Sequence, residues 1–594
     1  MKLRKILSFA LIISFMLAFT AACQSTDPGS TTNTPSPTST PAGSGGTAAT
    51  PVPVAEREHV TLRMYFRDTD TIWSSLDDEV GQKIYEDLKT EVEFLPFGES
   101  MWEKAAMMLA AQDWGDLDMV NTDMLEVTQM YIEAGALVRL DDYRDQLSNF
   151  YSYYTDVIPY LRSLDSENGD LYVWSAGPDQ MGLFQPPLDI CTRIDVMEAL
   201  GWPDLDTTDD YIDFLRKAIE MFPETNGQRS IGMSGLWGLA PDVGSVFATY
   251  LVRHSGFQHY YEVTGMVDPE TGRFIDLIPH EYNKEAMRFY NTLYREGLLD
   301  REIWTDGIPE LQDKMNSGVA ITANFMNWGV GEANREARER GQPEMQYLVT
   351  PIRLSIAKEE GRNVRYELYN ALRMDEMHGI LTSSPNIDRA IELVNYLATY
   401  EMTVKAGWGT EGVDFTIENG LMRYTDEFLE ISREGGRDFS WSKGFHGVWD
   451  LFPTRRYSLL PNGQAARGGA DPSTRVRTAD EVALYAFENM GWSHSVSGWW
   501  DNPHFDFVPF DISDYIVAST LDTESELNHL KTRIAQHIYE QLPRAINAST
   551  EAEFERIYDA LVNDVKSMGI QDILDHYNEA MGELHARMDE LRAR

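Results

Sequence analysis

The sequence predicts an α/β fold with two or more lobes, and two observations support that prediction. Segments with the periodicity of strands alternate with segments with the periodicity of helices from residue 59 to residue 121. The chain has 594 residues, and the part after its polar N-terminal tract is longer than one hydrophobic core usually holds. No repeat of fixed length is visible, so a solenoid is not expected.

The start of the folded region indicates a parallel sheet. Strand-like patterns occupy residues 59–66, 91–97 and 116–121, and helix-like patterns occupy residues 77–88 and 101–112. Neighbouring parallel strands need a crossover connection, and this order of segments places a helix between each pair of strands. We therefore expect an open α/β sheet with parallel neighbours.

Polar residues follow two of these strands. Arg67 and Asp68 come after the first strand, and Asn121 and Asp123 stand at the end of the third. In open α/β sheets, ligands collect at the carboxyl ends of the strands, where loops converge. We therefore predict that these four residues bind a ligand.

Three later helices have recognisable ends. Thr207 and Asp210 predict a capping box, and Ser384 is the expected N-cap of a second helix. Thr550 is expected to begin a third helix, which Gly569 ends. The apolar stripes of these helices are expected to face the core.

The N-terminus has the pattern of a secretory signal peptide. The first five residues carry three cations, residues 6–19 are apolar apart from two serines, and residues 20–22 are small. Because this run ends in Cys23, it resembles the bacterial lipoprotein signal. That resemblance implies a signal peptide at residues 1–22 and a lipid on Cys23. The alternative is an ordinary cleaved signal that a cysteine happens to follow.

A polar tract follows the signal. Residues 23–57 are rich in Ser, Thr, Pro and Gly, which bury too little apolar surface to offset the entropy of ordering. We expect a flexible tether there. If Cys23 carries lipid, Cys191 is the one remaining cysteine, so no intramolecular disulfide is expected.

The charge of the chain excludes one class of partner. The formal net charge is −45 at pH 7, and an acidic surface repels phosphate backbones, so nucleic acid is not expected as a partner. The simplest explanation of this charge is a solvated surface that keeps the protein soluble.

Several segments of the folded region resemble, in order, those of one protein family. The chain is similar to the extracellular solute-binding proteins of bacterial ABC importers, family 1-like, in the large lipoprotein branch common in Paenibacillus-like bacteria. The matching segments are "GDLDMVNTD" (115–123), "GALVRLDDY" (135–143), "GDLYVWS" (169–175), "RIDVMEALGWPDLDTTDDY" (193–211), "YNKEAMRFYNTLYREGLLDRE" (282–302), "MNSGVA" (315–320) and "GWGTEGVDF" (407–415).

This resemblance implies a particular architecture and role. It implies a two-lobe, periplasmic-binding-protein-like α/β fold with hinge strands between the lobes. The first lobe is expected to comprise residues 58–182 and 376–440, and the second residues 183–375 and 441–594. The resemblance also implies a monomeric, lipid-anchored receptor on the extracellular face of the cell membrane. Such a receptor closes its lobes over a small-molecule solute and delivers it to an ABC permease.

The sequence offers little that indicates an enzyme or a metal site. It contains no HExxH zinc motif, no GxSxG elbow and no Walker-type loop, and no catalytic residue is assigned. Some members of the family carry a calcium loop rich in Asp and Asn, where this chain reads "FPETNGQRSIG" (222–232). Calcium prefers six to eight oxygen ligands, and Glu224 is the one acidic residue there, so neither a metal nor another cofactor is expected.

Aromatic residues point to the class of solute. The chain has 14 tryptophans, several of them beside Gly, Asn or Ser in loop-like contexts. A sugar offers apolar C–H faces and a ring of hydroxyls, so a site for it combines flat aromatic side chains with carboxylates and amides. We predict that Trp174, Trp328, Trp408 and Trp499 contribute to ligand binding.

The leading hypothesis is a receptor for an oligosaccharide, and two alternatives stay open. One is a surface-anchored glycan-degrading enzyme. The other is a receptor for a peptide or another solute on the same fold, because a fold does not determine its ligand.

Overall fold

The computed structural model describes the folded part of the chain with gaps. The chain divides into a unit of residues 1–53 and a unit of residues 54–594, and every described residue lies in the second. Among the described residues, no helix is long and apolar enough to cross a membrane. Some side chains in described helices and strands, including that of Trp499, lie outside the description. The described residues are 57–66, 71–96, 101–122, 125–175, 190–237, 251–252, 265–324, 329–367, 377–445, 449, 458–495, 497–500, 503, 505–508, 513–522 and 525–594.

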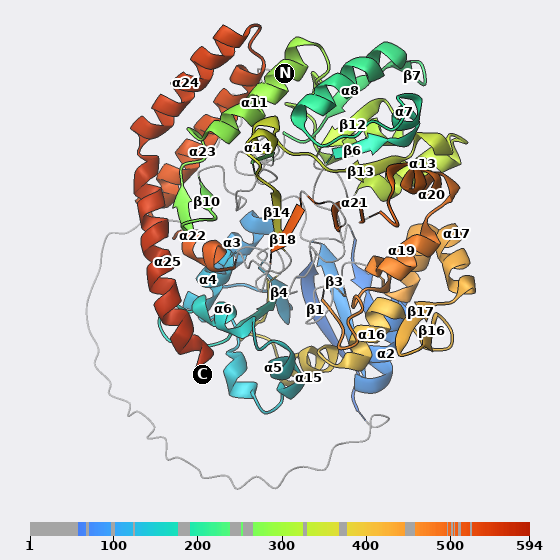
Figure 1. Cartoon of the computed structure of the whole chain (residues 1–594). Coiled ribbons are helices and arrows are strands. Elements are labelled where there is room, and N and C mark those ends of the chain that lie inside the picture. Colours follow the sequence, from blue (N-terminus) through green and yellow to red (C-terminus); the bar gives the residue numbers. More distant parts are fainter. Residues whose placement is uncertain are drawn as a thin grey trace, which may run out of the picture. The chain divides into compact units, whose positions relative to one another are not determined.

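The first sheet has six strands in the order β2-β3-β1-β4-β15-β5 (Figure 1). Strands β1, β3 and β4 are parallel, as predicted, whereas β15 is antiparallel to both β4 and β5. The carboxyl ends of β1, β3, β4 and β5 therefore lie at one edge. The strands are β1 (Val60–Phe66), β2 (Trp73–Ser74), β3 (Thr90–Pro96), β4 (Met119–Asn121), β5 (Val173–Ser175) and β15 (Met377–Ile380).

Local sequence explains the beginning of this sheet. Alternate residues of β1, Leu62, Met64 and Phe66, are fully buried, as the pattern of the strand predicts. Asp78 caps the following helix by accepting a hydrogen bond from the amide of Gly81 at 2.7 Å. The predicted helices are confirmed as α2 (Glu79–Leu88) and α3 (Met101–Ala111).

Further helices and a hairpin with its own hydrophobic cluster surround the first sheet. The hairpin of β16 (Phe415–Glu418) and β17 (Leu421–Tyr424) encloses its own hydrophobic cluster. The helices are α4 (Leu125–Glu133), α5 (Ser148–Tyr153), α6 (Ile158–Ser163), α15 (Ile387–Leu397), α16 (Tyr400–Trp408), α17 (Asp426–Lys443) and α19 (Pro472–Thr478).

The second sheet has four strands in the order β13-β6-β12-β9. Strands β9 and β12 are parallel, and β6 is antiparallel to both β12 and β13. The carboxyl ends of β9, β12 and β13 therefore lie at the same edge as the start of β6. The strands are β6 (Ile190–Arg193), β9 (Ile231–Ser234), β12 (Ala320–Asn324) and β13 (Tyr347–Thr350).

Helices and two short hairpins surround the second sheet. The hairpins are β7 (Glu224–Thr225) with β8 (Gln228–Arg229), and β10 (Met266–Asp268) with β11 (Arg273–Ile275). The helices are α7 (Ile194–Ala199), α8 (Thr208–Met221), α11 (Glu281–Arg295), α12 (Ile308–Asn316), α13 (Val330–Glu339), α14 (Ser355–Glu359) and α20 (Glu481–Met490).

Two strands on the chain's path between the sheets pair with each other. β14 (Val364–Glu367) and β18 (Phe505–Val508) are parallel partners, and β18 contacts the short helix α21 (Ser497–Trp500). The chain ends in α22 (Ser513–Ser519), α23 (Glu526–Ile546), α24 (Glu551–Met568) and α25 (Ile570–Arg592). Figure 1 shows α23 and α24 beside α11, and α25 beside α22 and α6. Buried residues of both sheets belong to one continuous hydrophobic cluster.

Contacts after residue 440 differ from the expected lobe boundary. Lys443 forms an ion pair with Glu79 at 2.6 Å, and the indole Nε1 of Trp449 donates to Asp78 at 2.7 Å. Helix α19 contacts β17, whereas α20 contacts α7. The chain therefore leaves the surroundings of the first sheet between α19 and α20, later than residue 440. The pairing of Lys443 with Glu79 is non-local, so no feature of the local sequence marks it.

Two helix starts are as predicted and one is not. Thr207 and Asp210 form the predicted capping box of α8, and Thr550 caps α24. The helix expected to begin after Ser384 begins two residues later, with Asn386 as its N-cap. The hydroxyl of Ser384 instead donates to Asp118 at 2.5 Å, which ties it to the end of the first sheet.

Candidate functional site

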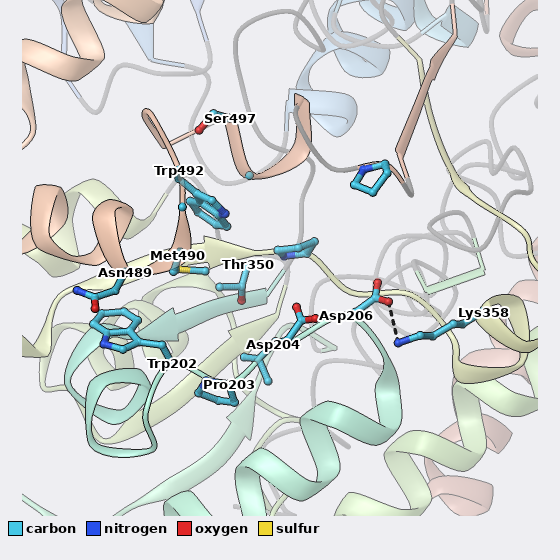
Figure 2. A pocket seen from close by; sticks show the side chains of 15 residues that line it. Trp202, Pro203, Asp204, Asp206, Thr350, Lys358, Asn489, Met490, Trp492 and Ser497 are labelled. Atoms are coloured by element: carbon cyan, nitrogen blue, oxygen red, sulfur yellow. Dashed lines mark ion pairs between the residues drawn. The ribbon is translucent and has the colours of Figure 1, made fainter.

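A cavity of about 560 Å³ lies at the carboxyl end of β13. Its lining comes from residues 202–206, residues 350, 351 and 358, and residues 489–492, 497, 498 and 503. Figure 2 shows Trp492 and Ser497 on one side of Thr350, with Trp202 and Asp204 on the other. Another cavity, of about 630 Å³, lies among the ion-paired side chains of α2 and α16, and none of its lining residues belongs to a strand of either sheet. We therefore take the cavity at β13 as the candidate binding pocket.

The end of α7 positions Trp202. The helix is followed by Gly201 with φ of 78° and by Trp202 with φ of 58°, so two successive residues are left-handed. The amide of Trp202 donates to the carbonyl of Met197 at 2.8 Å, which holds this turn. A non-glycine residue in this region is strained, and such strain is concentrated at functional sites. The backbone thus holds an indole beside the pocket.

The end of α20 positions Trp492 in a similar way. Gly491, with φ of 71°, is the C-cap of α20, and the amide of Trp492 donates to Phe487 at 2.7 Å. The ring of Trp492 lies directly on Gly498, where a Cβ atom would stand 2.2 Å from two ring carbons. The buried hydroxyl of Ser497 accepts from the amide of Ser493 at 2.8 Å and closes the intervening turn. Trp492 is therefore fixed from both sides.

The polar part of the pocket lining contains a buried ion pair. Asp206 Oδ2 lies 2.7 Å from an Nη of Arg353 and 3.1 Å from Nζ of Lys358. Burial raises the pKa of Asp206, but the hydrogen bonds from Arg353 and Lys358 lower it more, so the net pKa lies below its ordinary value. Asp206 is therefore ionised at neutral pH.

Other polar groups of the pocket are fixed or exposed. The Thr350 hydroxyl lies 2.6 Å from the Tyr211 hydroxyl and 2.7 Å from that of Thr192, so its position is set by its neighbours. Asp204 and Asn489 are exposed at the pocket. Two indoles beside carboxylate and amide groups suit a ligand with both apolar faces and hydroxyls. Asp206 is poorly suited to general acid catalysis, because that role needs a raised pKa.

A second polar group lies at the carboxyl edge of the first sheet. Asn121 ends β4, its Nδ2 lies 3.3 Å from Nδ1 of His378, and the two residues are register partners. The rings of His378 and Trp174 are 5.7 Å apart. Asn121 is buried, and its Oδ1 has no hydrogen-bond partner among the residues that the structure describes. Buried amide oxygens are nearly always satisfied, but the described residues leave this one without a partner, as they do the Oδ1 atoms of Asn283, Asn291 and Asn547.

The predicted binding residues fall into three groups. Asn121 lies at the expected edge. The indoles of Trp174 and Trp408 are fully buried, and Trp408 packs under the β16–β17 hairpin and donates to the carbonyl of Ala465 at 3.0 Å. Neither ring has an accessible face in this structure. Outside the description lie Cys23, Arg67, Asp68, Asp123, Trp328 and the side chain of Trp499.

Sequence reasoning did not select the two tryptophans of the pocket. Trp202 and Trp492 both follow a glycine that ends a helix, in "LGWPD" and "MGWSH". A helix-ending glycine places the next side chain outside the helix at a defined angle, so the repeated Gly-Trp pair was a usable signal. Neighbouring Asp204 and Asp206 lie within the family-like segment 193–211, but nothing local distinguishes them from other acids.

The loop that carries calcium in some relatives does not fit a metal here. Residues 224–229 form a hairpin with Asn226 and Gly227 at its turn, and Glu224 is its one carboxylate. The hydroxyl of Thr225 instead accepts a hydrogen bond from the buried guanidinium of Arg193 at 3.0 Å. A cation therefore already lies beside the hairpin, and too few oxygens are available for calcium.

A cluster of three carboxylates elsewhere already contains a cation. Asp300, Glu302 and Asp306 lie close enough together to hold a metal ion. Nζ of Lys314 lies 2.8 Å from Asp300 and 3.1 Å from Glu302, and it also pairs with Asp306. The ammonium group thus supplies the positive charge that these acids need.

The fold is that of ABC-transporter solute-binding proteins, as the comparisons with solved structures show. The predicted α/β fold class is confirmed. No protein-family model and no curated protein matches the sequence. The likeness to solved structures is therefore one of fold, at low sequence identity.

Three of these structures illustrate the likeness. An HMO-binding ABC-transporter-associated solute-binding protein from Bifidobacterium longum infantis matches with a TM-score of 0.60 and 14% identity, over 88% of this chain and 99% of that one. The Streptococcus pneumoniae substrate-binding protein FusA, in complex with kestose, matches with a TM-score of 0.59 and 12% identity, over 89% of this chain and 100% of that one. The alginate-binding protein AlgQ2, without calcium ion, matches with a TM-score of 0.57 and 15% identity, over 89% of this chain and 99% of that one.

Proposed function

We propose that this protein is the solute-binding receptor of an ABC importer and that its solute is an oligosaccharide. The observation that carries the proposal is the pocket between Trp202 and Trp492 at the carboxyl edge of the second sheet. The likeness, over 88–89% of this chain, to an HMO-binding protein, an alginate-binding protein and a substrate-binding protein in complex with kestose supports it. The two indoles suit the apolar faces of sugar rings, and Asp204 and Asn489 suit their hydroxyls.

The proposed mechanism is closure of two lobes around the solute. Trp202 and Trp492 would contact it from the second lobe, and Asn121 from the first. The other predicted contacts are Arg67, Asp68, Asp123 and Trp174 in the first lobe, Trp328 and Trp499 in the second, and Trp408. The rings of Trp174 and Trp408 are both buried in this structure. A solute that contacts both lobes favours the closed state by its higher affinity for it, and the permease would receive that state.

The protein is proposed to bind its solute without chemical change. Asp206 is held ionised by Arg353 and Lys358, so it lacks the raised pKa of a glycosidase acid. Incubation with an oligosaccharide that binds should therefore leave that oligosaccharide intact in mass spectrometry. Turnover at the pocket would instead support the glycan-degrading alternative.

We also propose a location, based on the N-terminal sequence. A lipid on Cys23 and a tether of residues 23–57 would hold a monomeric receptor at the extracellular face of the membrane, beside its permease. Cys23→Ala should then release the protein into the medium or leave it as a precursor. A normal mature protein that stays in the membrane fraction would contradict the anchor.

Calorimetric titration with a glycan panel tests the binding site. Once a glycan binds, Trp492→Ala should weaken its affinity by about 1 to 3 kcal/mol, because stacking on the indole face is lost. Ile431→Ala on α17 is the control, since Ile431 is 44% exposed and does not line this pocket or the cavity between α2 and α16. Equal effects of the two substitutions, or unchanged binding in Trp492→Ala, would remove the pocket from the proposal.

Binding of peptides alone is a further informative result. If the folded protein binds peptides of the panel and no glycan, the solute class is wrong while the receptor fold stands. Melting curves recorded on each variant separate loss of binding from loss of folding.

A further inference from the structure

We infer that the pocket selects a neutral oligosaccharide and discriminates against glycans that carry carboxylates or sulfates. The inference rests on the proposed function and adds the charge class of the solute. It comes from the pairing of the charged groups at the pocket.

The cations at the pocket are already paired. The charged groups of the lining are Asp204, Asp206 and Lys358. Lys358 and the buried Arg353 both approach the same oxygen of Asp206, at 3.1 and 2.7 Å, as Figure 2 shows for Lys358. An anionic sugar would have to take a cation away from Asp206 and leave that carboxylate buried with less compensation.

Asp204 adds a negative charge without a paired cation. Its carboxylate is exposed at the pocket and forms no ion pair with any residue that the structure describes. An exposed carboxylate accepts hydrogen bonds from sugar hydroxyls, but it repels a carboxylate on the sugar. The unpaired charge of Asp204 and the pairing of the two cations with Asp206 therefore both disfavour an anionic sugar.

The charge of the rest of the chain strengthens this selectivity. With a net charge of −45 over the whole chain, the long-range field opposes an anionic solute.

Matched glycan pairs test the inference. β-1,4-mannotriose and β-1,4-mannuronotriose differ in the carboxylates at C6, and cellotriose and its glucuronic counterpart form a second pair. We expect the neutral member of any pair that binds to bind at least about tenfold more tightly at low salt. Added NaCl should reduce this ratio, because screening weakens repulsion between exposed charges.

Two variants assign the selectivity to the pocket. Asp204→Asn should improve binding of the acidic trisaccharide about threefold or more relative to the neutral one, since one repulsive charge is removed. Asp209→Asn, which removes an exposed carboxylate outside the lining, should leave the ratio unchanged. Equal effects of the two variants would show that general charge, and not Asp204, sets the preference, and would overturn the assignment to the pocket.

The results separate this inference from the proposed function. Tight binding of an acidic trisaccharide, at or above the affinity for its neutral partner, overturns the charge selectivity but leaves an oligosaccharide receptor. Failure of the folded protein to bind any neutral or acidic glycan of a wider panel overturns both. Binding of neutral glycans with weak binding of their acidic partners supports both.

Discussion

Glycine at position 498 shows how a single residue shapes the pocket. Trp492 lies so close to Gly498 that any side chain there would overlap the indole ring. The backbone amide of Trp492 donates to the carbonyl of Phe487, its ring stacks on the Phe487 ring at 6.4 Å, and Ser497 closes the following turn, so the ring has little room to shift. The orientation of one wall of the pocket thus depends on the absence of one methyl group.

Gly498→Ala should displace the Trp492 ring and lower both stability and affinity. We expect the free energy of unfolding to fall by about 1 to 3 kcal/mol, the usual cost of overpacking, together with weaker binding of the glycan. Gly331→Ala on α13 is the control, because a Cβ there meets nothing within 4 Å. Urea unfolding and calorimetry on both variants measure these effects, and an unchanged Gly498→Ala protein would show that Trp492 moves freely.

Asp276 supplies a residue-scale test of pH dependence. Burial raises the pKa of Asp276 to about 6, although its carboxylate accepts a hydrogen bond from the amide of Ile278 at 3.0 Å. Between about pH 4 and pH 6 the folded protein holds a proton that the unfolded chain has lost, so stability falls as pH rises through this window. Above about pH 6, Asp276 is ionised in both the folded and the unfolded protein, so its effect on the free energy of unfolding no longer changes with pH.

Asp276→Asn should remove this pH dependence. The variant keeps an oxygen for the amide of Ile278 and carries no charge. The free energy of unfolding of the variant, relative to that of the parent protein, should therefore be about 1 to 3 kcal/mol higher at pH 7 than at pH 4. Urea unfolding at both pH values checks the difference. A difference between variant and parent that is the same at both pH values would contradict the raised pKa.

At the scale of elements, the C-terminal helix joins parts of the structure that are far apart in the sequence. Helix α25 contacts α22 and β11 as well as α6 beside the first sheet (Figure 1). Arg587 donates to the carbonyls of Asp165 and Ser166, and Arg594 donates to that of Asn168. Charged donors to backbone carbonyls are stronger than neutral ones, so this end of α25 is fastened to residues 165–169.

Arg587→Met should loosen that attachment while it keeps most of the aliphatic stem. Loss of two charge-assisted hydrogen bonds should lower the free energy of unfolding by about 1 to 3 kcal/mol and speed hydrogen exchange near residues 165–169. Arg592→Met, at a residue whose side chain is 52% exposed, should change stability by less than about 0.5 kcal/mol. The same small change in both variants would mean that the bonds of Arg587 contribute nothing.

At the scale of the whole molecule, binding and motion should be coupled. The six-stranded and the four-stranded sheet are separate, and each has its own carboxyl edge. The paired strands β14 and β18 lie on the chain's path between the two sheets. A solute held by both sheets would restrict their relative motion. A solute held by the pocket of the second sheet alone would not.

A saturating glycan should therefore reduce the radius of gyration in solution scattering. It should also raise the melting temperature, because it binds the folded, closed state in preference to others. Trp492→Ala at the same glycan concentration serves as the comparison, with both changes reduced in proportion to occupancy. Tight binding without a change in scattering would argue for a rigid pocket and against the proposed mechanism.

Much of the fold could be predicted because it is encoded locally. The alternation in β1, the apolar stripe of α2 and the caps at Thr207 and Thr550 depend on residues within a few positions of one another. The helix start at Ser384 was wrong for the opposite reason, since its hydroxyl binds Asp118, 266 positions away. The position of Asn121 at the carboxyl end of β4 was predicted because a strand end can be read from local pattern.

The sequence by itself determined the α/β class, the parallel strands at the start of the first sheet, the polar tract and the acidic charge of this protein. The tertiary structure alone decided which tryptophans face a pocket: Trp202 and Trp492 come together there from the ends of two helices, whereas Trp174 and Trp408 are buried. The physical reason is that burial depends on what packs over a side chain. In this protein the covering residues come from distant parts of the chain, which no local pattern specifies.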